Sequence, residues 1–195
     1  MKKRKLIQTR KEFYPFDFRK YLTVRNIIIF LIMVILYLTF PDYMQAIVLM
    51  IAFYPISLFT VKTTKYMRGM GIETITSFTI FLGYVYGWKI GMFFGFGIGT
   101  YIWAQAGMNQ KTLVQCLINA LCAFLGNWAS GFNMNFFWAY CIAAVIRNIV
   151  TFIVFLAVNP DIFNNALHTI TDFVWNTLIL SHIMNLLYDL VRLIS

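Results

Sequence analysis

Apolar runs of membrane-spanning length follow one another along most of this sequence, and they constrain the fold more than any other feature. A helix needs about 20 mainly apolar residues to cross a bilayer. Hydrophobic residues make up 61% of the 195 residues and charged residues 12%, against roughly 45–50% and 25% in soluble domains. A globular interior of this size is too small to bury that much apolar surface. The sequence therefore predicts an integral membrane protein and excludes a soluble enzyme, a disordered tail and a secreted disulfide scaffold.

Prolines, charges and polar loops divide the chain into seven candidate segments. They are residues 24–40, 43–61, 72–86, 90–106, 113–128, 136–158 and 163–193. Residues 72–86 are short, and residues 163–193 are too long for one perpendicular span, so part of the last segment tilts or lies in the interface. We predict an all-α polytopic transmembrane bundle of six or seven helices, with one transmembrane domain over residues 26–195.

Basic residues are concentrated before the first apolar segment. Residues 1–25 contain nine Lys or Arg and two acidic residues, a net charge of +7 out of +9 for the whole chain. Beside an apolar run, such a tail favours anionic lipid over nucleic acid as its partner, or else it only fixes orientation. The positive-inside rule makes residues 1–25 a cytoplasmic tail of a multi-pass protein in the cell membrane. Residues 62–68 and Lys111 are then also inside, and Lys89 is outside.

Glycines recur every four residues in the middle of the chain: Gly83, Gly87, Gly91, Gly95 and Gly99. One continuous helix over residues 72–106 would be about 52 Å long, well beyond the ~30 Å hydrocarbon core. We therefore predict a helical hairpin with its turn near Gly87. Small residues at this spacing let helices approach closely in lipid. The glycines thus indicate tight packing, either within the chain or against another subunit.

One charge lies deep in an apolar segment. Arg147 is near the middle of residues 136–158 and is followed by Asn148. A charge at the bilayer centre costs at least about 2.5–3.5 kcal/mol, so it should be paired or face a cavity. Among the acidic residues Glu73, Asp172 and Asp189, the best match in depth is Asp172. The arginine therefore forms a structural ion pair or binds an anionic ligand.

The last segment carries polar and bulky residues at alternating spacings of four and three: His168, Asp172, Trp175, Ile179, His182, Leu186 and Asp189. This spacing predicts one helix face, with Asn165 and Asn176 near it, turned toward the bundle interior. His168 and Asp172 are spaced for a shared metal, but two ligands do not make a site. A polar cavity wall is the favoured interpretation, and we expect neither a metal nor another cofactor.

Amides and an indole gather near the end of the fifth segment, at Asn127 and Trp128. They suit a small polar ligand with a ring, or an aromatic belt at the membrane interface. The predicted ligand site lies between the last three segments and comprises Asn127, Trp128, Arg147, Asn148, Asp172 and Asn176. No P-loop, HExxH or G-x-S-x-G motif occurs. No catalytic residue is therefore predicted, and an intramembrane enzyme using Asp172 and the two histidines is a minor alternative.

Residues 71–104, GIETITSFTIFLGYVYGWKIGMFFGFGIGTYIWA, resemble the early hairpin of S components, the substrate-binding subunits of energy-coupling-factor (ECF) vitamin transporters. Glu73 matches the acidic start, Gly87 the turn, and Gly91 with Gly95 the glycine helix. The resemblance implies a six-helix subunit that binds a vitamin or metal without its own ATPase. It also implies docking on a transmembrane coupling subunit driven by ATPases. The rod-shape protein MreD has a similar pattern, which implies the alternative of a membrane scaffold or assembly protein.

Overall fold

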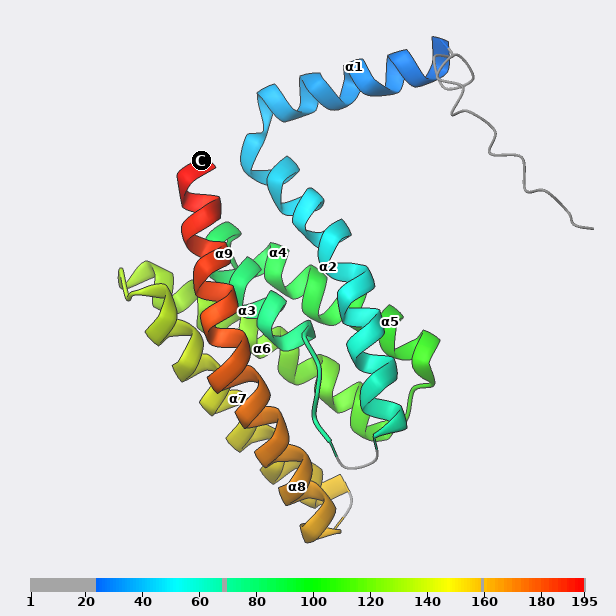
Figure 1. The fold of residues 1–195 in the computed structure, drawn as a ribbon, viewed down its shortest axis with the longest axis vertical. Helices are drawn as coiled ribbons and strands as arrows, with labels where there is room; N and C mark the ends of the chain where they lie inside the picture. Colours follow the sequence, from blue (N-terminus) through cyan, green and yellow to red (C-terminus); the bar gives the residue numbers. More distant parts are fainter. Residues whose placement is uncertain (1–23, 68–69, 159, 195) are drawn as a thin grey trace, which may run out of the picture. The chain divides into compact units, whose positions relative to one another are not determined.

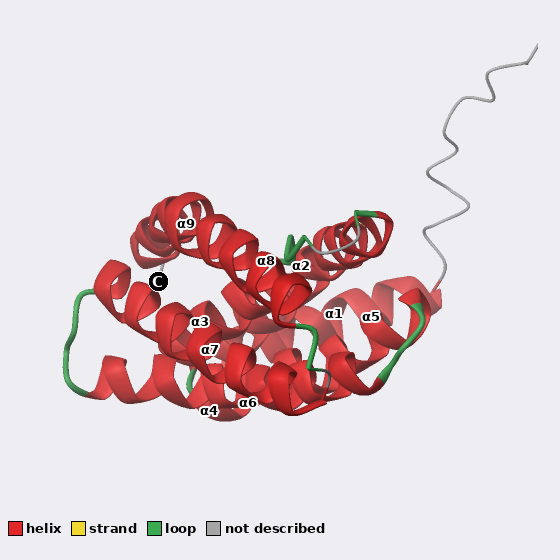
Figure 2. Ribbon diagram, turned by 90° about the horizontal axis from the view of Figure 1, so that it is seen from below, coloured by secondary structure: helices red, strands yellow, loops and turns green. Residues whose placement is uncertain are grey.

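The computed structural model describes residues 24–67, 70–158 and 160–194. Within these residues every regular element is a helix, and Figure 2 shows helices joined by short loops without strands. The predicted all-α fold is confirmed. Of the basic segment at residues 1–25, all but Val24 and Arg25 lies outside the described residues, so its cytoplasmic location stays a prediction.

Two units divide the chain, residues 1–41 and residues 42–195. The first contains α1, and the second contains the other helices from Asp42 onward (Figure 1). The helices are α1 (Val24–Thr39), α2 (Pro41–Tyr66), α3 (Ile75–Tyr86), α4 (Trp88–Met92), η2 (Phe93–Ile98), α5 (Gly99–Ala106), α6 (Gln110–Gly131), α7 (Phe136–Val158), α8 (Ile162–Phe173), η3 (Val174–Leu180) and α9 (Ser181–Ile194). The elements η2 and η3 are π-helical turns that continue the neighbouring α-helices.

Four described helices are long and apolar enough to cross a membrane: α2, α6, α7 and the continuous helix Ile162–Ile194. The bounds of α7 are those predicted from the sequence. Helix α6 begins earlier than predicted because Asn109 caps it: its side chain accepts a hydrogen bond from the backbone N–H of Thr112, and its own backbone N–H donates to the Thr112 hydroxyl. Helix α3 begins at Ile75, later than predicted, and has only 12 residues. The lengths and apolar composition of the four long helices are those of a membrane-embedded protein.

Helix α3 lies at the centre of the second unit. Every residue from 75 to 83 is buried, so this stretch has no exposed face. Helix α6 packs along it, and α4, α7 and α9 also contact it (Figure 1). The short helix is therefore enclosed by longer ones and positions the residues at its start inside the bundle.

The predicted hairpin is present, with its turn at Gly87. This residue ends α3 and precedes α4, and its φ of 94° is in the region that side chains rarely adopt. The turn reverses the chain so that α4 and η2 pack back against α3.

The glycines of the hairpin pack against neighbouring elements of the same chain. A Cβ atom at Gly83 would lie 2.5 Å from the carbonyl oxygen of Ala123, and one at Gly91 would lie 2.7 Å from the backbone nitrogen of Gly83. At Gly95 and Gly99 the nearest atoms belong to side chains of α3. These glycines bring α3, α4, η2, α5 and α6 closer together than larger residues would allow.

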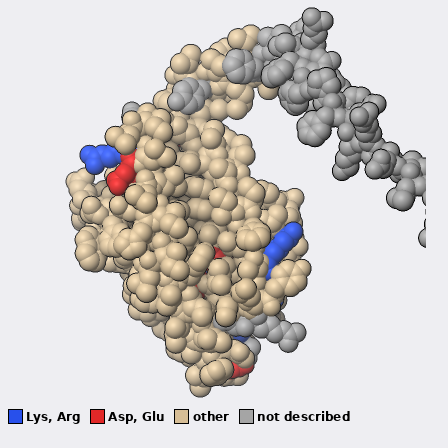
Figure 3. All heavy atoms as spheres, in the orientation of Figure 1, with Lys and Arg blue, Asp and Glu red and all other residues tan. Residues whose placement is uncertain are grey.

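The second unit is apolar outside and encloses buried charged groups beside an apolar core. Figure 3 shows few charged side chains on the face that it presents, and large apolar residues such as Ile51, Phe59 and Ile153 are exposed. The buried side chains, in contrast, include Glu73 and Arg147. This distribution matches a lipid environment, in which charged and polar groups turn toward the interior of the bundle.

The π-helical turn η3 changes which face of the last helix is buried. From Asp172 onward this helix buries Asp172, Asn176, Leu180, Ser181 and Met184. Trp175 still packs against the core, but His182 and Asp189 are exposed, so the predicted polar face is wrong beyond Asn176. A π turn closes hydrogen bonds to the fifth residue and thereby accommodates one extra residue, which rotates the helix that follows.

Candidate functional site

Arg147 is fully buried on α7 and is bound by two carboxyl groups. Its Nη2 lies 2.7 Å from Oε1 of Glu73, and its Nη1 donates to Oδ2 of Asp172. The sequence favoured Asp172 alone as the partner, whereas the structure provides both carboxylates. Glu73 lies in the non-helical residues before α3, and Asp172 lies on α8. This charged triad of Glu73, Arg147 and Asp172 therefore joins three segments of the bundle.

On the Glu73 side, hydroxyl and amide groups extend the triad. The Thr76 hydroxyl donates to Oε1 of Glu73 over 2.8 Å and lies 3.0 Å from Oδ1 of Asn119 on α6. The side chains of Thr76 and Asn119 are fully buried. The acidic end of the triad is thus connected to α6 through one hydroxyl group.

On the Asp172 side, Asn176 is the connecting residue. Its Nδ2 donates to Oδ1 of Asp172 over 3.0 Å, and its Oδ1 accepts a hydrogen bond from the Ser77 hydroxyl. The Ser77 hydroxyl also bonds the phenol of Tyr140 on α7. The π turn therefore carries an amide that links α8 to α3 and α7.

Four of the six residues predicted for the ligand site come together: Arg147, Asn148, Asp172 and Asn176 are all buried, and Oδ1 of Asn148 lies 3.3 Å from Nη1 of Arg147. The other two lie elsewhere. Trp128 is 58% exposed and packs against Phe132, and Asn127 is half-buried beside Gly87. The four buried side chains bind one another and leave no cavity of their own among the pockets described below.

A polar cavity of about 370 Å³ lies next to this network. Its lining includes Lys65 from α2, Trp103 from α5, Lys111 and Gln115 from α6, and His168 from α8. Nζ of Lys111 donates to Oδ1 of Asn165 over 2.8 Å and lies 5.4 Å from the centre of the Phe155 ring. The sequence had placed both lysines on one side of the membrane but gave no sign that they share a cavity, because five separate helices (α2, α5, α6, α7 and α8) contribute to its walls.

Several buried nitrogen atoms around the cavity have no hydrogen-bond partner among the described residues. They are Nε1 of Trp103, Nε2 of Gln115 and Nε2 of His168. The carboxylate that lines the cavity, Asp161, caps α8 and accepts a hydrogen bond from the backbone N–H of Asn164. Hydrogen bonds from Asn164 lower the pKa of this carboxyl group. With two ammonium groups and unpartnered donors, the cavity suits a small molecule that carries an anionic group.

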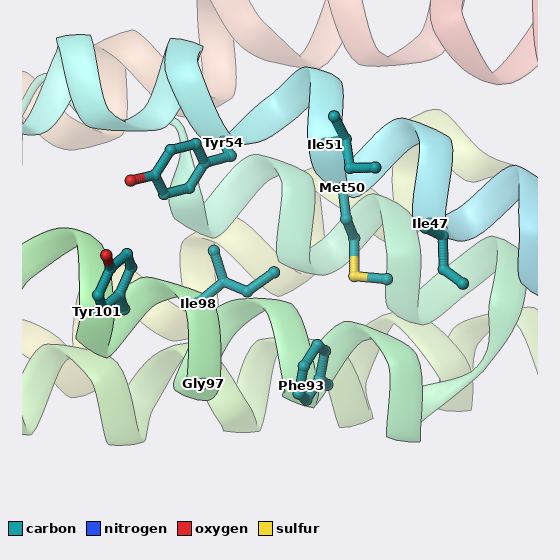
Figure 4. A pocket seen from close by; sticks show the side chains of 8 residues that line it. All are labelled: Ile47, Met50, Ile51, Tyr54, Phe93, Gly97, Ile98 and Tyr101. Atoms are coloured by element: carbon teal, nitrogen blue, oxygen red, sulfur yellow. The ribbon is translucent and has the colours of Figure 1, made fainter. Parts of the chain in front are cut away.

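A second pocket is apolar and lies between α2 and the η2–α5 helix. Figure 4 shows its lining side chains on the two helices: Ile47, Met50, Ile51, Tyr54, Phe93, Gly97, Ile98 and Tyr101. The volume is about 580 Å³, and no charged side chain lines it. Such a groove fits a hydrocarbon chain and has little that would orient a polar solute.

Metal ligands do not converge in the described part of the chain, where no group of three or more His, Cys, Asp or Glu side chains is placed to hold an ion. Comparisons of the whole chain with protein-family models, with curated proteins and with solved structures gave no match. The polar cavity and the charged triad are therefore the features that bear on function.

Proposed function

We propose that this protein is an integral membrane subunit that binds a small anionic solute for transport, similar to an S component and without its own ATPase. The observation that carries the proposal is the polar cavity, where Lys65 and Lys111 meet buried donors that lack partners. Its volume of about 370 Å³ falls in the range of roughly 300–1,000 Å³ typical of small-molecule sites.

The cavity offers separate groups for the two ends of such a solute. A carboxylate or phosphate accepts hydrogen bonds from the ammonium groups of Lys65 and Lys111. An apolar or ring-shaped part packs against Trp103 and Phe155, which line the same cavity. The indole N–H of Trp103 and the amide of Gln115 gain partners when the solute carries acceptors. When a site is empty and its hydrogen-bond donors are unpaired, molecules that carry acceptors bind much more tightly than molecules that lack them.

The proposed site also adjoins the groups that hold the helices together. Gln115 is one turn before Asn119 on α6, and His168 is one turn before Asp172 on α8. A bound solute is thus one helical turn from the charged triad on two different helices. With the N-terminus in the cytoplasm, this end of the bundle faces the cytoplasm, the side on which an importer releases its solute.

The test is binding of carboxylate- and phosphate-bearing vitamins to the full-length protein in mild detergent, followed by native mass spectrometry and thermal unfolding. Lys65→Met and Lys111→Met are each expected to weaken binding at least tenfold, since each removes one charge-assisted contact. Lys62→Met and Lys89→Met are matched controls, because both lysines are exposed and neither lines the cavity. Equal losses in all four variants, or no stabilisation by any anionic compound, would overturn the proposal.

The scaffold alternative makes a different prediction for cross-linking in native membranes. A transport subunit captures ATPase components of a transporter, whereas an MreD-like scaffold captures cell-shape or envelope proteins. The glycine spacing, which suited packing either within the chain or against another subunit, is used within the chain at Gly83, Gly91 and Gly95. Of the hairpin glycines, Gly97 is exposed and has only the Phe93 ring nearby.

A further inference from the structure

The charges of the triad do not balance. Glu73 and Asp172 carry two carboxyl groups and Arg147 one guanidinium, and the side-chain exposures are 1%, 1% and 0%. With both carboxyl groups ionised, the buried cluster has a net charge of −1. An uncompensated charge in a low-dielectric interior is so costly that the group neutralises instead. Inside a membrane protein the same cost marks a site that binds a counter-charge.

The hydrogen bonds of the triad show where a counter-charge is missing. Oε1 of Glu73 accepts from Arg147 and Thr76, but Oε2 is buried and has no partner within the described parts of the chain. Both oxygens of Asp172, in contrast, accept hydrogen bonds, one from Asn176 and one from Arg147. An ionised oxygen without donors is the least stable arrangement of this carboxyl group, and a proton on it removes the charge.

Neighbouring ionisable groups do not supply the missing positive charge. Cys116 and Cys122 on α6 and Tyr140 on α7 are within electrostatic reach of the carboxyl groups, and such groups are uncharged or negative, never cationic. His168 on α8 stacks near Phe155, and its Nε2 has no acceptor among the described residues, which disfavours the doubly protonated ring. Nζ of Lys111 donates to Asn165, and both residues line the polar cavity.

We propose that the charged triad binds one exchangeable proton, carried by the carboxyl groups of Glu73 and Asp172, so that the buried cluster is neutral. The proton binds at an oxygen lone pair and breaks no other bond. This inference does not depend on the identity of any solute.

A line of polar side chains connects this proton site to the cavity. Gln115 lines the cavity, and Asn119 follows it by one turn on α6. Asn119 lies 3.0 Å from the Thr76 hydroxyl, which lies 2.8 Å from Glu73. The amide nitrogens of Gln115 and Asn119 are both unpartnered within the described residues. These polar groups lie between the proton site and the cavity, which is therefore the side from which the proton would exchange.

The test is infrared spectroscopy of the full-length protein in lipid vesicles at neutral pH, measuring the C=O stretch of protonated carboxyl groups. The wild type is expected to show the band of one carboxylic acid. Glu73→Gln and Asp172→Asn are each expected to lose it, because either change leaves one carboxylate paired with Arg147. Arg147→Lys is expected to keep one band, and Arg147→Gln to double it. Asp161→Asn and Asp189→Asn, which alter carboxyl groups outside the triad, are the controls.

Two results would overturn the inference. One is a wild type without a protonated carboxyl band at neutral pH, which means that both carboxyl groups are ionised. The other is a band that persists in both Glu73→Gln and Asp172→Asn. The wild-type spectrum alone shows whether a protonated carboxyl group is present, so the test remains decisive even where a variant fails to fold. Neither outcome bears on solute binding, which is measured with the lysine variants.

Discussion

Nη2 of Arg147 lies 2.7 Å from Oε1 of Glu73, although the two residues are 74 positions apart in the chain. The contact attaches the start of α3, which is not yet helical at Glu73, to the middle of α7. Asp172 attaches α8 to the same guanidinium. Three elements that are distant in sequence thus share one cation, and the arrangement of the bundle depends on its charge.

Removing that cation is expected to destabilise the protein severely. Arg147→Leu leaves two carboxyl groups without their partner, and breaking a buried ion pair from one side costs about 3–5 kcal/mol. Unfolding in mixed detergent micelles measures the loss. The combined variant with Glu73→Gln and Asp172→Asn contains no buried charge and should recover most of the stability. If Arg147→Leu unfolds at the wild-type denaturant concentration, the triad does not organise the bundle.

Close packing of α3 against α6 predicts different costs for two glycines of the hairpin. Gly83→Ala places a methyl group 2.5 Å from the carbonyl oxygen of Ala123 and should destabilise by about 1–3 kcal/mol. Gly97→Ala meets only the Phe93 ring at 3.6 Å and should be neutral or stabilising by up to about 1 kcal/mol. Thermal unfolding of both variants in one detergent compares them. Equal costs would contradict the packing seen in the structure.

The extra residue in η3 predicts an unusual tolerance to deletion. Deleting Ile179, which is exposed within η3, lets the π turn relax to an α-helix without rotating α9 relative to α8. Deleting Ile149, which is also exposed but lies within the regular helix α7, rotates half of that helix by about 100°. We expect folded, monodisperse protein for the first deletion and none for the second, judged by size-exclusion chromatography. Loss of both proteins would show that the π turn is required as it stands.

The shared cavity predicts the sidedness of the lysines. Because Lys65 and Lys111 line one cavity, cysteines placed there should react with an impermeant maleimide from the same side of the membrane. A cysteine at Lys89, just after the turn at Gly87, should react from the other side. With a cytoplasmic N-terminus, the first two react only after permeabilisation. Cys141, which is partly exposed, is replaced by alanine in this background. Labelling of all three from one side would contradict the hairpin crossing.

Much of the architecture was predictable because lipid imposes strong patterns. Asn and Pro after Val158 end an apolar run of spanning length, and the bounds of α7 follow from that run. The turn at Gly87 was predictable because one continuous helix through this residue would have been too long for a bilayer. The ion pairing of Arg147 was predictable because a cation buried in the membrane requires a partner. Each of these inferences rests on one segment and its depth in the membrane.

What the sequence did not predict depends on how separate segments meet. The joint pairing of Glu73 and Asp172 requires a non-helical approach to α3, which no periodicity signals. The cavity of Lys65 and Lys111 is assembled from residues of five helices. The rotation at η3 turned His182 out of the bundle interior, and a regular helical period cannot anticipate an inserted residue.

Helix α3 has a consequence for how the protein is made. It is 12 residues long and has no face for lipid over residues 75–83, so it is too short to cross a bilayer alone. Helices α6, α7 and α9, which contact it, are synthesised later. Helix α3 is therefore made before most of the helices that enclose it. Its final position is reached by assembly of helices within the membrane, after the last span has been translated.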